Sequence, residues 1–409
     1  MQSQIQSTQG STKAARTFLS NRTVVIALSV FLNVAGFTII LPVVPFLVGR
    51  YVPSDQIGLY TGLIVSVYAL CAFCAAPVLG ALSDRYGRRP VMVLSLLGST
   101  VGYLVFGFGG ALWVLFLGRI VDGLTAGNIS TVYAYVADTH RPEQRGHVYG
   151  MLGAVAGLGF MLGPVAGGAL GSFSPTAPLY TAAMLMLANA VWVYAALPES
   201  DNPDADRPAW RWRQIDPVGQ LVNVLRQAPL RIPFLAAFSF FFAGAMLQSN
   251  FAVYLQQLYE FGPAGIGWAL FGVGVMDVVS QGLLTRVLMP RLGADALTKL
   301  GLAVNAVGFA FIAGLVFAPR LELLAGALFV FTLGDGLFQP AMSAIIANAA
   351  PDNAQGLVQG ANQAQQSMAR MLGPLLAALL SPIALNAPYW AGALIIVVGF
   401  AALMFRKPA

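Results

Sequence analysis

The stretch GALSDRYGRRP, residues Gly80 to Pro90, places one acid and three arginines between two long apolar segments. The first apolar segment runs from about Ile57 to Leu82 and overlaps the start of this stretch. The second runs over 91–108. Each is long enough to cross a bilayer core of roughly 30 Å as a helix. The stretch between them therefore predicts a tight, cationic turn at one face of a membrane.

The composition of the whole chain indicates a membrane environment. Of its 409 residues, 57% are hydrophobic and 9% are charged, with a mean hydropathy of +0.73. Soluble proteins carry about 25% charged residues. The net charge of +6 does not indicate nucleic-acid binding, because the basic residues stand singly or in short clusters between apolar runs.

Twelve apolar runs are long enough to span the membrane as helices. Turn signals such as Gly262-Pro263 and Pro351-Asp352-Asn353 separate them. The runs are 24–48, 57–82, 91–108, 112–137, 147–171, 178–197, 232–258, 264–288, 296–317, 321–349, 356–380 and 388–405. The predicted fold class is an all-α integral membrane protein with twelve transmembrane helices and both termini on one side.

The distribution of basic residues predicts which side holds the termini. Of the 22 Lys and Arg residues, only Arg50 and Arg320 fall in loops on one side of the membrane. Arg119 and Arg370 lie within spans, and all the others are on the opposite side. Because Lys and Arg are enriched in cytoplasmic loops, both termini are predicted to be cytoplasmic.

A polar stretch divides the spans into two sets of six. We predict a disordered cytoplasmic tail over 1–21, which is rich in Gln, Ser and Thr and precedes an uncleaved first helix. An N-terminal six-helix bundle follows over 22–197, then a cytoplasmic linker over 198–231 and a C-terminal six-helix bundle over 232–409.

The two sets of six are internal repeats. Met161-Leu162-Gly163-Pro164 recurs as Met371–Pro374, and Asp122-Gly123-Leu124 recurs as Asp335–Leu337. Repeats that share one orientation predict two bundles related by a pseudo-two-fold axis along the membrane normal, with a site at their interface.

Three motifs resemble those of a known family. The Gly80–Pro90 turn resembles the loop signature between helices two and three of the major facilitator superfamily, and Leu117–Asn128 resembles its helix-four signature. The fifth span matches the helix-five pattern of the drug:proton antiporters at Gly150, Gly159, Gly163, Pro164, Gly167 and Gly168. The N-terminal half looks most like bacterial tetracycline-type efflux proteins.

This resemblance implies the major facilitator fold and a proton-coupled exporter, or antiporter, of small amphipathic organic compounds or drugs by alternating access. It also implies a monomer in the bacterial inner membrane whose partners are protons, a small-molecule substrate and lipid, with no nucleic acid. The proton gradient is the expected energy source, and no cofactor is expected. The alternative is a transporter of a physiological metabolite or lipid, by antiport or facilitated diffusion.

An enzyme is not expected from the sequence. No pairing of a nucleophile with a base is visible. Cys71 and Cys74 have no further Cys or His in their span to complete a metal site.

The spaced glycines of the fifth span have a physical interpretation as well. Small residues on one helical face let helices approach closely, and Pro164 bends a span that changes partners during transport. The alternative is ordinary packing, because small-residue faces are common in membrane helices.

The family resemblance implies that the Gly80–Pro90 turn is a gate. Asp84 can pair with Arg85, Arg88 or Arg89, and Gly87 permits the sharp turn. Such a cluster is expected to hold the two halves together on the cytoplasmic side when the cavity faces outward. The alternative is a topology anchor, in which the arginines only fix the orientation of the chain in the membrane; this alternative leaves Asp84 unexplained. The gate loop consists of Gly80, Asp84, Arg85, Gly87, Arg88 and Arg89.

Charged residues within the spans are expected to couple protons to transport, because charges in hydrocarbon are costly. Arg119 and Asp122 share a helical face and form either a titratable pair or a static structural one. Asp277 is the strongest candidate for carrying a proton, and its alternative is an ion pair with Arg370 or Arg119. Asp335 is expected to face the central cavity and to bind a proton, a cationic group or both.

The resemblance implies that spans one, four, seven and ten line the cavity. Its expected lining includes Asn33, Phe37, Tyr133, Gln248, Asn250, Asp335 and Phe338. The acids that tetracycline efflux proteins carry in spans one, three and nine align with Asn33, Gly102 and Asn305. A cationic metal–tetracycline complex would therefore meet a different charge layout in this chain.

Span eleven carries a polar stripe at spacings of four, three and four residues. Its members are Gln359, Gln363, Gln366 and Arg370. By analogy with the superfamily this stripe meets span two at the seam between the halves, and a sliding polar interface is expected there rather than a substrate site.

The gate interpretation is testable at one residue. Replacing Asp84 with Asn removes the charge that the arginines of the turn can bind, so transport should slow while membrane insertion is unchanged. The measurement is transport per unit of inserted protein. Transport at the wild-type rate would contradict the gate interpretation and favour the topology anchor.

Overall fold

The computed structural model describes residues 21–200, 217–350 and 355–405, and helices are the only regular elements in these ranges. Residues 1–20 of the predicted tail and 201–216 of the predicted linker lie outside the described residues. In the N-terminal half the helices are α2 (Asn21–Thr38), α3 (Val44–Val48), α4 (Ile57–Tyr86), α5 (Arg88–Phe108), α6 (Leu112–Leu124), α7 (Asn128–Thr139), α8 (Pro142–Phe173) and α9 (Ala177–Ala196).

The C-terminal half has a matching set of helices. They are α10 (Pro217–Leu225), α11 (Ala228–Tyr259), α12 (Pro263–Val279), a π-helical turn over Ser280–Leu284, α13 (Thr285–Gly314), α14 (Leu321–Ala349), α15 (Gln355–Leu380) and α16 (Ala387–Met404). Short 3₁₀ turns occupy Ser54–Gln56 and Leu315–Phe317.

Nine helical stretches of the described residues are long and apolar enough to cross a membrane. One of them, Pro263–Phe317, contains two helices, because the φ and ψ angles of Gly293 are not helical and the chain turns there. Counting these two separately, and adding α2 and the more polar α15, is consistent with the twelve predicted spans. The chain is a multi-pass membrane protein with an all-helical fold.

The repeat is visible in two backbone turns. Gly87, between α4 and α5, has φ 104° and ψ 151°, and Gly293, within α13, has φ 75° and ψ 163°. Residues with a side chain rarely adopt this positive φ. Glycine at both positions therefore allows the same sharp turn after the second span of each half.

Two predicted spans are not continuous helices. The first run ends as a helix at Thr38 and resumes as α3 with Pro45 in its first turn. The fourth run breaks between α6 and α7, where the Thr125 hydroxyl donates to the carbonyls of Val121 and Asp122. Proline, and a threonine side chain that bonds to the preceding turn, both weaken continuous helical pairing.

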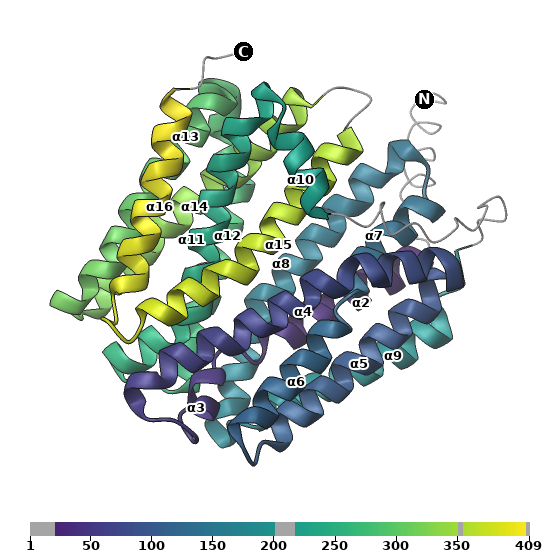
Figure 1. Cartoon of the computed structure of the whole chain (residues 1–409), viewed down its shortest axis with the longest axis horizontal. Helices are drawn as coiled ribbons and strands as arrows, with labels where there is room; N and C mark the ends of the chain where they lie inside the picture. Colours follow the sequence, from purple (N-terminus) through teal and green to yellow (C-terminus); the bar gives the residue numbers. More distant parts are fainter. Residues whose placement is uncertain (1–20, 201–216, 351–354, 406–409) are drawn as a thin grey trace, which may run out of the picture.

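Each half has its own apolar core, and the two halves lie side by side (Figure 1). The linker helix α10 belongs to the C-terminal half, where Val224 is fully buried and α10 packs against α11 and α15. The polar composition of residues 198–231 did not indicate this helix.

The halves meet along two seams, α4 against α15 and α8 against α12, the first of which is seen in Figure 1. Glycines allow the contact at one end of each seam. A Cβ on Gly62 would lie 2.7 Å from the Cβ of Ala378, and a Cβ on Gly168 would lie 2.5 Å from the carbonyl oxygen of Pro263. Both distances are too short for any side chain.

The opposite end of the α8 seam is open. The same face of α8 continues through Gly157, Gly153, Gly150 and Gly146, where a Cβ would meet nothing within 4 Å. The halves therefore touch at one end and separate at the end that carries the Gly80–Pro90 turn. If that end is cytoplasmic, as the basic residues predict, the cavity faces the cytoplasm.

The spaced glycines of α8 serve two contacts. Gly159, Gly163 and Gly167 face α2, where a Cβ on Gly163 would lie 2.0 Å from the Thr38 hydroxyl oxygen. Gly168 faces α12. The packing interpretation thus describes these four positions, but it is wrong for Gly150 in this conformation, because Gly150 lies at the open end.

Gly167 and Gly150 provide a matched pair for testing this packing. A Cβ on Gly167 would lie 1.8 Å from the carbonyl oxygen of Ile39, so Gly167→Ala must displace backbone and should cost about 1–3 kcal/mol. Gly150→Ala should be neutral or slightly stabilising, since Ala favours helix by about 0.5–1 kcal/mol. Melting temperatures of the purified variants test this; equal values for both would contradict it.

Candidate functional site

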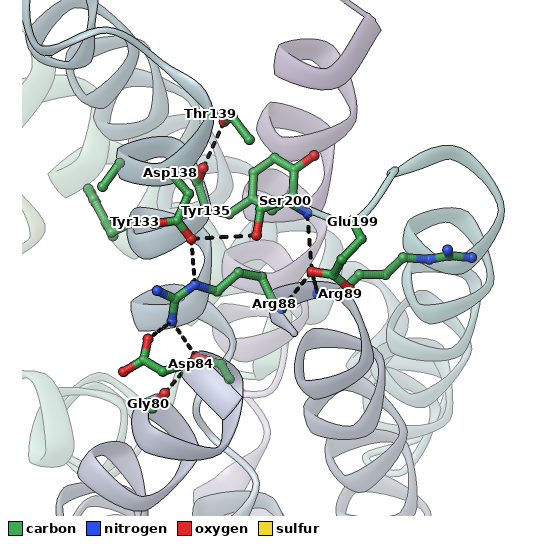
Figure 2. A network of polar contacts seen from close by, with 12 residues as sticks. Gly80, Asp84, Arg88, Arg89, Tyr133, Tyr135, Asp138, Thr139, Glu199 and Ser200 are labelled. Carbon is green, nitrogen blue, oxygen red and sulfur yellow. Dashed lines mark hydrogen bonds and ion pairs between the residues drawn. The ribbon is translucent and has the colours of Figure 1, made fainter. Parts of the chain in front are cut away.

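Charged side chains hold the Gly80–Pro90 turn in place (Figure 2). Arg88 forms an ion pair with Asp84 and a second one with Asp138 at the end of α7, where Nε lies 2.8 Å from Oδ2. Arg88 also donates to the Ser83 hydroxyl at 2.7 Å. Among the arginines named as partners for Asp84, the structure selects Arg88.

Glu199, which follows α9, caps the first turn of α5 (Figure 2). Its Oε1 accepts hydrogen bonds from the backbone N–H groups of Arg88 at 2.7 Å and Arg89 at 3.2 Å. A carboxylate at this position satisfies unpaired N–H groups and interacts favourably with the helix dipole. Sequence analysis missed Glu199 and Asp138, although both are acids at span ends on the side of the arginine-rich turn.

The described contacts of the gate loop all come from the N-terminal half. Arg85 lies over the ring of Tyr86, and Arg89 lies over the ring of Tyr194, with distances to the ring centroids of 5.4 Å and 4.7 Å. Gly80 accepts a hydrogen bond from Ser83. This arrangement agrees with the halves being separated at this end, and it leaves the predicted latch between the halves untested.

Arg119 and Asp122 form a buried ion pair on α6. Nη1 of Arg119 lies 2.8 Å from Oδ2 of Asp122, and the two side chains are 5% and 4% exposed. The guanidinium is also surrounded by three aromatic rings, with centroid distances of 5.2 Å to Tyr68, 5.6 Å to Tyr103 and 4.9 Å to Phe106. Ion pairing and cation–π contacts together stabilise a charge that water does not reach.

This enclosure favours the static alternative for the Arg119–Asp122 pair. A Cβ on Gly102 of α5 would lie 2.7 Å from the Cβ of Asp122, so α5 closes the pair from one side. Tyr133, expected in the cavity lining, lies on α7 beyond the break that follows α6 and is 40% exposed. Tyr133 lies against Tyr149 of α8, with ring centroids 5.1 Å apart.

Asp277 on α12 and Asp335 on α14 face each other within hydrogen-bonding reach. Gln281 Nε2 donates to both carboxylate oxygens of Asp277 at 2.9 Å, and Gln339 Nε2 donates to Oδ2 of Asp335 at 2.8 Å. Two carboxyl groups can hydrogen bond to each other only when one of them carries a proton. We call these two acids the carboxyl pair.

Close packing of α12 and α14 creates the carboxyl pair. A Cβ on Gly336 would lie 2.4 Å from the Cβ of Ser280, and the Thr285 hydroxyl donates to the Gly336 carbonyl at 2.8 Å. The π-helical turn after α12 begins at Ser280, and such turns are frequent at functional sites. Both acids were predicted as site residues singly, but their contact was not.

Neither acid of the carboxyl pair makes the ion pair considered as its alternative. The ion pairs of the described residues join Arg88 to Asp84 and Asp138, and Arg119 to Asp122. The carboxyl pair is therefore free of arginine partners within the described part of the chain.

The polar stripe of α15 lies where the halves have separated. Gln359, Gln363 and Arg370 are exposed, and Gln366 is half-buried. The packed part of the α4–α15 seam begins one turn further along, where the carbonyl oxygen of Pro374 would lie 2.8 Å from a Cβ on Gly62. The expected sliding interface is therefore not formed by these side chains in this conformation.

The predicted cavity residues divide into two groups. Asn33 and Phe37 are half-buried, and Gln248 is exposed. Asn33 Nδ2 lies 3.9 Å from the Met186 sulfur, and the Phe37 ring centroid lies 5.7 Å from that of Tyr68. These positions are compatible with a cavity wall.

Two of the expected lining residues do not line a cavity here. Phe338 is fully buried and stacks on Phe240 with ring centroids 4.3 Å apart, so it belongs to the apolar core. Asn250 is 2% exposed and lies at the closed end, where its Oδ1 would be 3.4 Å from a Cβ on Gly58. A helix can point a side chain toward its own bundle as readily as toward the cavity, and packing decides between them.

Two helical bundles with repeated topology, closed at one end and holding buried charges, define a membrane transport protein. Residues 26–318 and 233–409 match the Major Facilitator Superfamily, and the chain belongs to this family. It is 32% identical over 390 residues to the tetracycline resistance protein, class C, of Escherichia coli, covering 95% of this chain and 96% of the relative.

Two further comparisons agree with this family. The chain is 27% identical over 387 residues to multidrug resistance protein 2 of Bacillus subtilis (strain 168), covering 94% of each. Its fold is similar to the crystal structure of a D-xylose-proton symporter, with a TM-score of 0.73 at 14% identity over 95% of this chain and 98% of that one.

The buried ion pair on α6 can be tested by removing one charge or both. Asp122→Asn leaves the Arg119 guanidinium buried without its counter-charge and should destabilise the protein by about 3–5 kcal/mol. The double variant Arg119→Met/Asp122→Asn should recover much of that loss, because no uncompensated charge remains. Thermal unfolding of purified protein measures both, with Asp55→Asn at the exposed closed end as control. An unchanged melting temperature for Asp122→Asn would contradict the structural role.

Proposed function

We propose that this protein is a proton-coupled exporter of small amphipathic organic compounds, working as an antiporter by alternating access. The observation that carries the proposal is the carboxyl pair of Asp277 and Asp335, two facing carboxyl groups within the membrane-spanning part of the C-terminal half that can share and release one proton. Support also comes from the relatives, which are a tetracycline resistance protein and a multidrug resistance protein.

The geometry suggests how the proton is coupled. With the proton bound, the carboxyl pair carries a single negative charge, and Gln281 and Gln339 satisfy the remaining oxygens. Without the proton, two carboxylates would face each other across α12 and α14 and repel. Proton binding and proton release therefore change the preferred distance between α12 and α14 in the C-terminal bundle.

Alternating access follows from the two seams. The open end of the cavity admits the compound from the side of the gate loop, and closing that end requires the glycine-lined contacts at the other end to separate. The network around Arg88 lies on the N-terminal half at the open end, where it is positioned to meet the C-terminal half when the cavity closes.

The proposal includes a location and an energy source. We place the protein in the bacterial inner membrane with both termini in the cytoplasm, on the basis of its basic loops. The proton gradient drives export, no bound cofactor takes part, and one chain contains a complete pair of bundles and acts as a monomer. Transport of a metabolite or lipid is the weaker alternative, since the relatives named above are resistance proteins.

The carboxyl pair is the point at which to test proton coupling. In everted vesicles with an acidic interior, adding tetracycline, rhodamine 6G or fluorescein should release protons through the wild-type protein. Asp277→Asn and Asp335→Asn should each reduce this release by about tenfold or more, because the remaining acid cannot share a proton as before. Asp55→Asn removes an acid outside the pair and is the control.

The readout is the recovery of a pH-sensitive dye inside the vesicles, normalised to inserted protein. If both carboxyl variants exchange protons at the wild-type rate, the pair is not the coupling site. If the wild-type protein releases no protons with any of the three compounds, proton-coupled export of such compounds is wrong.

A further inference from the structure

Arg370 is a cation in the interior of α15 that has no described counter-charge. The ion pairs of the described residues join Arg88 to Asp84 and Asp138, and Arg119 to Asp122, and none includes Arg370. Its side chain is exposed, although it lies ten residues before the end of the helix at Leu380. A charge at such a depth normally has a partner or lines a functional pathway.

The position of Arg370 is the inner limit of the open cavity. One turn further, the carbonyl oxygen of Pro374 would lie 2.8 Å from a Cβ on Gly62 of α4, so the two halves are in contact from there on. In the other direction, Gln363 and Gln359 are exposed on the same face of α15. A compound that enters from the open end and moves inward therefore reaches the guanidinium last.

Aromatic groups of the other half lie opposite this arginine. Arg370 is within electrostatic range of the Tyr68 side chain on α4. The Tyr68 ring is tilted by 31° against Phe37 on α2, with the centroids 5.7 Å apart. A guanidinium offers several N–H donors in one plane, and aromatic rings offer flat apolar surface, so the two together suit an aromatic compound with an anionic group.

Charges elsewhere in the spans do not neutralise Arg370. Asp122 is already paired with Arg119, and the two acids of the carboxyl pair face each other rather than Arg370. Arg119 lies 5.2 Å from the centroid of the same Tyr68 ring, but its ion pair with Asp122 compensates its charge. Arg370 is therefore the uncompensated cation near this ring among the described residues, and it disfavours a second cation there.

The positions aligned with acids in tetracycline efflux proteins support the same conclusion. Gly102 packs directly on Asp122, and Asn305 is buried and donates to the Phe331 carbonyl at 3.1 Å. Asn33 is uncharged and lies near Met186. None of these three places a negative charge where a cationic compound would bind.

We propose that Arg370 binds the anionic group of the transported compound, so that the substrates are aromatic organic anions or zwitterions. This inference rests on the proposed function as an exporter and specifies its substrate class. The guanidinium, exposed at the inner end of the cavity, gains a counter-charge when the substrate arrives, and the Tyr68–Phe37 pair supplies the apolar surface beside it.

Two dyes of similar shape and opposite charge test this inference. Fluorescein is an aromatic anion, whereas rhodamine 6G is a cation built on the same three-ring system. Their affinities for the purified full-length protein in lipid nanodiscs can be measured by fluorescence anisotropy. Arg370→Gln should weaken fluorescein binding by about tenfold or more, and Arg370→Lys should weaken it less, because a charge remains but the planar donor set is lost.

The controls separate loss of charge from loss of structure. Rhodamine 6G affinity should be unchanged or increased in Arg370→Gln, because a repulsive charge is removed. Arg50→Gln removes an exposed arginine in the loop between α3 and α4, at the closed end, and should leave both affinities unchanged. The inference is overturned if Arg370→Gln binds fluorescein as wild type does, if it loses both dyes equally, or if the wild-type protein binds no fluorescein.

The outcome is distinguishable from that of the exporter proposal. If Asp277→Asn stops proton exchange while Arg370→Gln keeps its fluorescein affinity, the exporter stands and the anion site is wrong. If fluorescein binds through Arg370 but releases no protons in wild-type vesicles, the anion site stands and proton coupling of its ligand is wrong.

Discussion

A charge within the hydrocarbon core of a membrane is stable only when it is paired, shares a proton or reaches water, and the ionisable groups inside these bundles follow that constraint in three different ways. Arg119 is paired with Asp122 inside an aromatic enclosure. Asp277 and Asp335 face each other across two helices, an arrangement in which one proton can be shared between them. Arg370 is exposed where the halves separate. The roles that we propose for these three arrangements differ accordingly: a fixed structural pair, an exchangeable proton and a site for a counter-charge.

Helix contacts made by glycine decide where water can reach these groups. At the closed end, backbone lies against backbone along both seams, as at Gly168 against Pro263, and no side chain fits between. At the open end the same face of α8 has no neighbour within 4 Å of a Cβ at Gly150. Because both states of an alternating transporter must form such contacts in turn, residues without side chains keep the energetic difference between them small.

The sequence predicted much of the fold because its signals are local. Apolar runs, turn residues, the asymmetry of Lys and Arg, and the spacing of Gly150 to Gly168 each depend on a short window, and together they indicate the membrane-spanning class, the two repeats and the family. The breaks after Thr38 and at Thr125–Gly127 were missed because hydropathy does not register them. The linker helix α10 was missed because it is stabilised by packing on α11 and α15 rather than by its own composition.

By itself, the sequence determined the number and order of apolar segments, the repeat, the gate loop and which ionisable residues lie inside the spans, because each of these is a property of consecutive residues. Only the tertiary structure decided which of those residues meet. It joined Asp277 to Asp335, placed Asp138 and Glu199 beside the gate loop, buried Phe338 in the core and gave Arg370 no counter-charge among the described residues. The physical reason is that helix rotation and crossing depend on side-chain volume at contacts between distant segments, as at Gly336 against Ser280, and no local pattern contains that information.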